Sequence, residues 1–303
     1  MSFDLIIQSA LSHFVLQLLR LSIWLVLLTV VFVPLERLFA IHPEKIFRKA
    51  IATDISYYFL SSLVPSILLG GPMAFIAWSA HQLIPSAFAN WVATMPIWAK
   101  ITGALIVGDI GFYWGHRLSH EIPLLWRFHA IHHSAEHIDF LVNTRAHPVD
   151  MVFTRLCGLI PLYVLGFAAP LQGKVSLIPL VVLLFGVSWG FFVHANLRWR
   201  FGPLEWFIST PAFHHWHHTN DGPTYANKNY APMLPWIDRL FGTLYLPRNT
   251  QSKTFGIDEP VAPGLLGQLI APFLGEAERE LNPPRASDAN GPAADLRRPK
   301  LAS

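Results

Sequence analysis

The chain contains 303 residues, of which 52% are apolar and only 14% carry a charge. An ordinary soluble protein has about 25% charged residues, so the composition excludes a soluble globular protein and indicates an integral membrane protein. The formal net charge of +3 is too small to indicate a nucleic-acid partner. The single cysteine, Cys157, excludes a disulfide framework, a cysteine-ligated zinc site and an iron–sulfur cluster.

Five apolar segments are predicted to cross the membrane, because a hydrocarbon core about 30 Å thick needs about 20 apolar residues in a helix. In chain order they are residues 14–33, 55–80, 97–115, 151–169 and 177–195. The second segment contains two prolines and two glycines between residues 65 and 72, which fit either one kinked span or a re-entrant hairpin. One crossing is preferred, since it places the basic loops on a single side, which the positive-inside rule assigns to the cytoplasm.

These segments predict an all-α, multi-pass membrane helical bundle of about five spans with a histidine-rich helical cap on its cytoplasmic face. Residues 1–50 form the first span and a basic loop, residues 51–247 the main membrane domain, and residues 248–303 a C-terminal extension. The extension is rich in Pro, Ala, Asp and Arg from about residue 276, which predicts disorder there. The host membrane is expected to be a bacterial inner membrane or the endoplasmic reticulum.

Histidine is the unusual residue, because 12 of the 15 histidines lie between residues 116 and 218. His116 and His120 are spaced i, i+4, two H-x-x-H-H runs occupy residues 129–133 and 214–218, and His194 stands alone. Positions i, i+3 and i+4 share one face of a helix, so each run is expected to aim three imidazoles at one point. His215 falls off that face and is the weakest candidate of its run.

A metal explains this concentration better than ordinary packing does. Protonated, these imidazoles would repel one another, and neutral, they would leave many polar atoms unpaired near an apolar core. Imidazole binds metals in its neutral form, so a metal resolves both difficulties. Nine or ten imidazoles exceed the four ligands of a tetrahedral zinc site, which indicates a dimetal site in the cap. The zinc-protease pattern H-E-x-x-H is absent, and imidazole suits iron and zinc alike, so the residues alone leave both metals open.

The motifs, taken in order, resemble those of the membrane-bound fatty acid hydroxylase and sterol desaturase superfamily. The resemblance rests on H-R-L-S-H at 116–120, H-A-I-H-H-S at 129–134, H-x-x-H-H at 214–218, D-x-x-x-Y-W-x-H-R at 109–117, R-x-H-P at 145–148, N-K-N-Y at 227–230 and W-I-D-R-L-F-G-T at 236–243. It covers residues 50–247, about two thirds of the chain. One of these motifs alone would be a weak signal, but all of them in order are specific.

The resemblance implies a non-haem di-iron oxidoreductase that uses O2 to hydroxylate or desaturate a lipid, such as a sterol or a fatty acyl chain. Carried over position by position, the metal ligands are His116, His120, His129, His132, His133, His194, His214, His217 and His218. Related hydroxylases often have a further histidine where this chain has Arg198. His147, His137 or a water held by Asn196 are therefore the candidates for a tenth ligand. The implied cofactors are two iron ions, with zinc as the alternative in isolated protein, and O2 is the co-substrate.

Polar residues near the motifs are candidates for orienting a ligand or contacting the substrate. They are Asp109, Asn143, Arg145, Asp150 and Asn196. Asp109 lies inside a predicted span, where a charge is costly without a partner. Helical spacing places it near Tyr113 and His116, where it would orient an imidazole, and an ion pair with Arg145 is the structural alternative.

The partners follow from what the chain lacks. It has no dinucleotide-binding, haem-attachment or cysteine-cluster motif, so an external electron donor is expected, either a cytochrome b5-like protein or a ferredoxin with its reductase. The lipid substrate is expected to enter from the bilayer.

Several alternatives stay open at the level of sequence. Desaturation is the alternative within the same class. A histidine-rich membrane metal transporter and a zinc-bound lipid-modifying enzyme without redox chemistry are the alternatives from other classes. A transporter should distribute its ligands across the bilayer midplane, whereas nearly all of these histidines lie in loops or at span ends on one predicted side.

Overall fold

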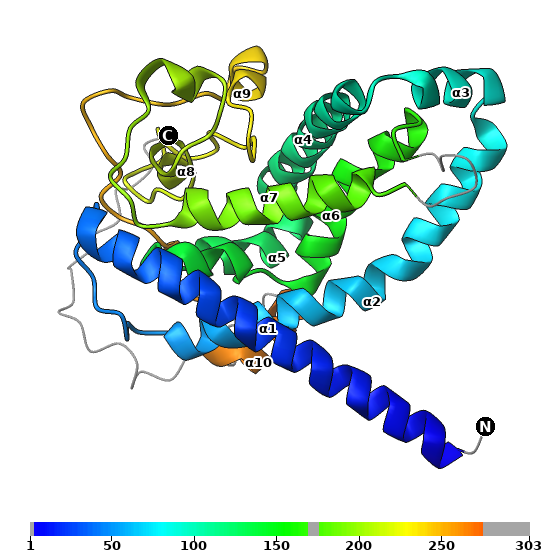
Figure 1. The fold of residues 1–303 in the computed structure, drawn as a ribbon. Helices are drawn as coiled ribbons and strands as arrows, with labels where there is room; N and C mark the ends of the chain where they lie inside the picture. The colour runs from blue at the N-terminus through cyan, green and yellow to red at the C-terminus, as the bar shows by residue number, and fades with distance from the viewer. Residues whose placement is uncertain (1–2, 169–175, 275–303) are drawn as a thin grey trace.

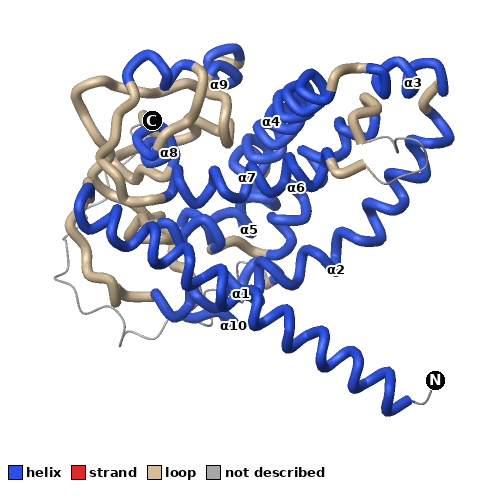
Figure 2. The backbone as a smooth tube through the Cα atoms, in the orientation of Figure 1, coloured by secondary structure: helices blue, strands red, loops and turns tan. Residues whose placement is uncertain are grey.

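The fold was obtained as a computed structural model, which describes residues 3–168 and 176–274. Within those ranges every regular element is a helix, and the sole β-pairing is an isolated bridge between Thr219 and Phe255 (Figure 2). The all-α class is therefore confirmed. The tail predicted to be disordered from about residue 276 lies outside the described residues, as does most of the predicted turn between the fourth and fifth spans.

Two helices are long and apolar enough to cross a membrane, namely α1 (Phe3–Phe39) and α2 (Ile51–Leu83). Trp24 and Val30 on α1 are each more than 60% exposed, which is the surface expected of a helix that faces lipid. The second helix is continuous through Pro65 and Pro72, so this segment forms one helix rather than a re-entrant hairpin. Its prolines are accommodated within the helix, as is common in membrane spans.

The third candidate span is a bent pair of helices. α3 (Ser86–Thr94) and α4 (Ile97–Glu121) meet at a bend of 116°, and together they are apolar enough to count as one span. α6 (Pro148–Val164) and α7 (Ile178–His194) occupy the positions of the fourth and fifth predicted spans. Each has 17 residues, at the lower limit of the roughly 17–25 that a span needs. The described residues thus contain two or three candidate spans, and the total of five stays a prediction.

Helices α4 and α6 approach closely because small residues line their contact. A Cβ added to Gly111 would lie 2.2 Å from the carbonyl oxygen of Cys157, and one added to Gly158 would lie 2.4 Å from the ring of Phe112. Glycines of this kind let two helix backbones pack together where larger side chains would hold them apart. The contact fixes the end of α4 beside the start of α6, where the candidate ligands begin.

The remaining helices of the described residues are short. They are α5 (Pro123–His133), η1 (Phe140–Thr144), η2 (Gly202–Trp206), α8 (Pro211–His217), α9 (Trp236–Leu240), α10 (Gly264–Ile270) and η3 (Ala271–Phe273). In Figure 1, α5, α8 and α9 lie on the side of the molecule opposite α3. An apolar cluster that includes Tyr58, Phe140 and Phe191 joins α2, η1 and α7. The cluster therefore packs α7, which carries His194, against the long apolar helix α2.

Candidate metal centre

The nine histidines predicted as ligands lie in two compact groups, and within each group the ring nitrogens that face one another are all within 4.8 Å. Group A consists of His116, His120, His129, His133 and His217. Group B consists of His132, His194, His214 and His218. The structure thus brings together all nine residues, from four separate stretches of the chain.

The two H-x-x-H-H runs divide between the groups, so the expectation that each run aims three imidazoles at one point is wrong. His133 belongs to group A and its neighbour His132 to group B. His217 and His218 are divided in the same way. Successive residues of a helix point about 100° apart, so adjacent histidines diverge toward two different points.

Group A has the signature of an ion-binding site. All five of its Nε2 atoms are buried and have no hydrogen-bond partner. A buried polar atom left unpaired costs about 1–3 kcal/mol, so five of them at one point require an explanation. A cation coordinated by the five nitrogens satisfies every one of them.

The positions of the imidazole protons indicate that group B is an ion-binding site as well. The Nε2 atom of His194 lies 2.9 Å from that of His214 and 3.2 Å from that of His132. The Nδ1 atoms of His194 and His132 each face a backbone carbonyl, which requires the proton to be on Nδ1 and leaves Nε2 with a lone pair. Two lone pairs at 3.2 Å repel each other, and a cation between them removes the repulsion. His218 completes the group, with its Nε2 3.1 Å from that of His214.

The same arrangement of Nδ1 toward an acceptor recurs in group A. The Nδ1 of His116 lies 2.8 Å from the Tyr230 carbonyl oxygen, and that of His217 lies 2.8 Å from the Lys228 carbonyl oxygen. His129 Nδ1 lies 3.0 Å from one carboxylate oxygen of Asp150, and the other oxygen of that carboxylate accepts a hydrogen bond from the Ser119 hydroxyl. Partners of this kind fix ring orientation and leave Nε2 for a metal.

Burial keeps the imidazoles neutral, which is the form that binds metals. Desolvation lowers the pKa of His132 to about 3, and neighbouring imidazoles lower it further. Burial likewise lowers the pKa of His214, His217 and His218 well below the usual value. These rings are therefore uncharged at neutral pH even though they crowd one another.

Asp109 holds a backbone segment rather than an imidazole or an arginine. Its buried carboxylate accepts hydrogen bonds from the backbone amides of Met233 and Leu234, at 3.1 and 2.9 Å. The prediction that Asp109 contacts His116 or Arg145 directly is therefore wrong. Asp109 nevertheless restrains the segment whose Tyr230 carbonyl faces His116, so its influence on the group passes through the backbone.

Asp238, which sequence reasoning missed as a site residue, restrains the same segment from the other side. Its carboxylate accepts from the amides of Tyr230 and Ala231, at 2.7 and 2.8 Å, and from the Thr243 hydroxyl at 2.6 Å. Burial raises its pKa to about 6. Asp238 lies inside the family-like motif W-I-D-R-L-F-G-T at 236–243, which could have marked it as a candidate site residue. The motif does not reveal what its carboxylate binds.

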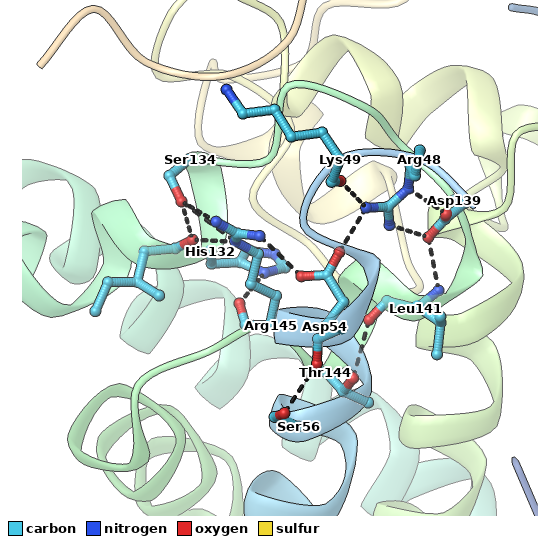
Figure 3. A network of polar contacts seen from close by, with 12 residues as sticks. Arg48, Lys49, Asp54, Ser56, His132, Ser134, Asp139, Leu141, Thr144 and Arg145 are labelled. Carbon is cyan, nitrogen blue, oxygen red and sulfur yellow. Dashed lines mark hydrogen bonds and ion pairs between the residues drawn. The ribbon is translucent and has the colours of Figure 1, made fainter. Parts of the chain in front are cut away.

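Arg145 connects group B to the membrane helix α2 through a buried ion network (Figure 3). Its carbonyl oxygen faces His132 Nδ1 at 3.0 Å, while its guanidinium donates to Asp54 at 2.8 Å. The second oxygen of Asp54 accepts from Arg48 at 2.7 Å, and Arg48 also binds Asp139. Asp54 was not predicted. A single carboxylate near the start of a long apolar helix is the signal that could have found it.

The two predicted asparagines contact the backbone, and neither is among the residues that make up the two histidine groups. Asn196 accepts from the amides of Ile41 and His42 and donates to the His42 carbonyl, so its amide closes the turn after α1. Both ends of its side chain thus contact the backbone, and a water held by Asn196 as a tenth ligand stays a prediction. The Asn143 side-chain amide donates to the Val187 carbonyl of α7 at 3.5 Å.

The remaining histidine candidates lie outside both groups. His147 caps α6 by accepting from the Val149 amide, and its other nitrogen faces the Leu269 carbonyl at 3.1 Å. His137 lies 2.8 Å from Glu44 in an ion-pair geometry. His215, the weakest candidate of its run, faces the Ala195 carbonyl. Among the described residues, no histidine therefore joins the nine as a tenth.

The fold and the site together define a helical membrane protein that carries a paired histidine centre, and the comparisons with known proteins name the family. Residues 101–243 match the model of the fatty acid hydroxylase family. The chain is 35% identical over 211 residues to the ornithine lipid hydroxylase OlsE of Rhizobium tropici, which covers 69% of this chain and 61% of that protein. It is 28% identical over 184 residues to alkylglycerol monooxygenase of Xenopus tropicalis, which covers 61% of this chain and 37% of that protein.

The chain therefore contains a fatty acid hydroxylase domain and belongs to the superfamily that its histidine motifs indicate. The resemblance inferred from those motifs is confirmed. The chain spans less than two thirds of the length of either relative. No solved structure matches it.

Proposed function

We propose that this chain is a membrane-bound, non-haem di-iron oxidoreductase that uses O2 to hydroxylate a membrane lipid. The observation that carries the proposal is the set of five buried, unpartnered Nε2 atoms in group A beside the converging Nε2 atoms of group B. The two relatives are a lipid hydroxylase and an alkylglycerol monooxygenase by name, which supports hydroxylation over desaturation.

Group A would hold one iron ion through five imidazoles and group B the other through four. When bound, the pair of ions would supply the activation of O2 and the cleavage of an unactivated C–H bond. The chain's own residues keep the imidazoles neutral, fix which nitrogen each presents, and bury the rings away from water. Exclusion of water matters here because it suppresses side reactions of a strong oxidant.

The polar residues around the centre act on ligand position. Asp150 orients His129 directly, Asp109 restrains the segment that orients His116, and Arg145 orients His132 through its carbonyl. Partners of this kind typically change metal affinity or activity by about 10–100-fold. We therefore assign them to positioning rather than to contact with the substrate.

The proposed topology has five spans and a cytoplasmic histidine cap. The end of α1, the start of α2 and the ends of α4 and α7 would lie on the cytoplasmic side, where the basic loop at 37–49 favours retention. Residues 51–247 would form the catalytic domain, with a lipid substrate reaching the centre from the bilayer. An external donor, cytochrome b5-like or ferredoxin-type, would supply the electrons.

The test is metal analysis combined with product analysis on protein purified in detergent without chelators. The expected result is two irons per chain and O2 consumption that depends on a lipid extract and a reductant. The product should gain one oxygen atom derived from 18O2. A product that has lost two hydrogens would identify desaturation instead. Zinc alone, with no oxygen consumption, would contradict the redox function.

A further inference from the structure

A cavity of about 230 Å³ lies between the end of α1, the start of α2 and the loop that joins them. One wall is apolar and includes Leu25 and Val33 of α1 and Ile55 of α2. The other end is polar and includes Glu36 and Lys45. None of the nine histidines lines it, so the cavity is separate from the metal centre.

The position of the cavity along α1 sets the kind of molecule that fits it. Leu25 and Val33 lie within the candidate span Leu11–Phe39, whereas Glu36 and Arg37 lie at the end of that span. An occupant must therefore be apolar toward the bilayer and polar toward the loop. The volume is below the roughly 300–1,000 Å³ of pockets that enclose a whole small ligand, so it suits a lipid headgroup whose chains stay in the bilayer.

Two of the three carboxylates that line the cavity already have basic partners within the protein. Asp139 accepts from Arg48 at 2.6 and 2.8 Å (Figure 3). Glu44 lies 2.8 Å from His137. These two groups therefore have less capacity for a cation from outside.

Glu36 is the exception among the three. One of its oxygens accepts from the backbone amides of Phe140 and Asn196, at 2.9 and 3.0 Å. Among the described residues, no basic side chain forms an ion pair with this carboxylate within 4.0 Å. A partly buried carboxyl group without a cation avoids the cost of its charge by taking up a proton. An ammonium group beside Glu36 would favour the charged carboxylate and pair with it.

The cations of the cavity lie at its mouth. Arg37 and Lys45 are both exposed and both line it. The guanidinium of Arg37 is placed by a hydrogen bond of 2.6 Å to the Glu44 carbonyl. A molecule that fits this charge pattern carries an apolar tail, a positive group beside Glu36 and a negative group beside Arg37 and Lys45.

We propose that this cavity is a binding site for one zwitterionic phospholipid whose ammonium group pairs with Glu36. The phosphate lies against Arg37 and Lys45, and the upper part of an acyl chain covers the apolar wall formed by Leu25 and Val33. A primary ammonium is favoured because it donates hydrogen bonds to the carboxylate, and such charge-assisted bonds are stronger than neutral ones. The site goes beyond the proposed oxidation reaction and does not depend on it.

The test is native mass spectrometry of the metal-loaded full chain in detergent, titrated with lipids that share the same two oleoyl chains. Phosphatidylethanolamine, phosphatidylglycerol and diacylglycerol separate the contributions of ammonium, phosphate and tail. We expect one tightly retained phosphatidylethanolamine per chain, bound about tenfold more tightly than phosphatidylglycerol, the size expected of one charge-assisted hydrogen bond. Equal binding of the two phospholipids, or a preference for phosphatidylglycerol, would overturn the proposal.

The decisive variant is Glu36→Gln, because the amide keeps an oxygen for the two backbone donors and removes only the charge. It should lose the tenfold preference while retaining its metal content. The matched control is Glu136→Gln, an exposed carboxylate whose side chain is 65% accessible and which does not line the cavity. A preference that survives Glu36→Gln would also overturn the proposal.

A second variant keeps the test valid if Glu36→Gln fails to fold. Lys45 is exposed at the cavity mouth, so Lys45→Glu should leave the fold intact while placing a negative charge against the phosphate. We expect it to weaken phosphatidylethanolamine binding several-fold and to leave diacylglycerol unaffected. Unchanged phosphatidylethanolamine binding in this variant would contradict the placement of the headgroup.

Discussion

Groups A and B contain the same side chain, but they are attached to different parts of the molecule. In group A, His116 and His217 face carbonyls of the segment 228–234, which Asp109 and Asp238 restrain. In group B, His132 faces Arg145, which Asp54 links to the long apolar helix α2. Group A is thus supported by α4 and the segment 228–234, and group B by Arg145 and α2, so damage to either support should affect mainly one group.

The largest effect is expected from removing one ligand in each group. His217→Ala in group A and His218→Ala in group B should each lower iron from about two to about one per chain. Activity should fall by more than the about 10–100-fold that loss of an outer partner costs. Iron quantification and O2 consumption measure both effects. His215→Ala, in the same helix but outside both groups, is the control, and full activity in either ligand variant would remove that residue from its group.

The next largest effect is expected from Asp54→Asn, which should act on group B. The change leaves the buried guanidinium of Arg145 without its charged partner. Breaking one side of a buried pair typically costs about 3–5 kcal/mol of stability. We expect a lower unfolding temperature, which thermal denaturation measures. We also expect preferential loss of the group B metal, which the spectrum of the cobalt-substituted protein measures. Loss confined to group A would refute this link.

A control for that experiment is available on the same face of the protein. Glu136 and Lys49 are 3.9 Å apart with side chains about two thirds exposed. Exposed pairs contribute about 0–1 kcal/mol. Glu136→Gln should therefore leave both metals and the unfolding temperature unchanged.

Asp238→Asn should act on group A and by a smaller amount. The amide can still accept from the Tyr230 backbone, but its NH2 group meets the amide donor of Ala231. We expect about tenfold weaker metal binding, at the lower end of the range for outer partners, and little change in group B. Competition with a chelator measures the two affinities. An equal loss from both groups would mean that the segment 228–234 supports them together.

Lowering the pH should destabilise the metal-free protein, and the effect of each titrating histidine should be smaller than the effects of the substitutions above. Burial lowers the pKa of His132 to about 3, whereas an unfolded histidine titrates near 6.5. Below about pH 6.5 the unfolded state binds a proton that the folded state does not. Each such histidine therefore makes its full contribution to the free energy of unfolding above about pH 6.5. Below that pH the free energy of unfolding falls by about 1.4 kcal/mol per pH unit for each of them. Thermal unfolding between pH 8 and pH 5 tests this, and a constant unfolding temperature would contradict it.

The nine histidines that the structure brings together could be predicted from sequence, because each carries over from a motif of the family that the chain resembles. The roughly 100° between successive helical residues already separates His132 from His133. Which histidines of other segments join each of them depends on how α5 packs in the folded chain, and that could not be predicted from sequence. Contacts such as Asp54 with Arg145, which are 91 residues apart, exist only in the folded chain. The contacts of Asn196 could not be predicted for the same reason, because its partners come from the turn after α1.

The fold, too, could be predicted from sequence only in part. Long apolar runs predicted α1 and α2, and the structure adds that the prolines of α2 do not interrupt it. The break between α3 and α4 was less visible, because it depends on a short connection that contains Pro96. Glycines such as Gly111 and Gly158 were not singled out, although they determine how closely α4 and α6 approach.

The division of adjacent histidines between the groups also links the two groups through the backbone. His132 and His133 are consecutive, as are His217 and His218, and consecutive Cα atoms are 3.8 Å apart. The rings of His133 and His218, one from each group, stack with centroids 4.4 Å apart. The backbone therefore joins group A to group B covalently at two points, one in α5 and one at the end of α8, so a shift of one set of ring nitrogens has a direct route to the other.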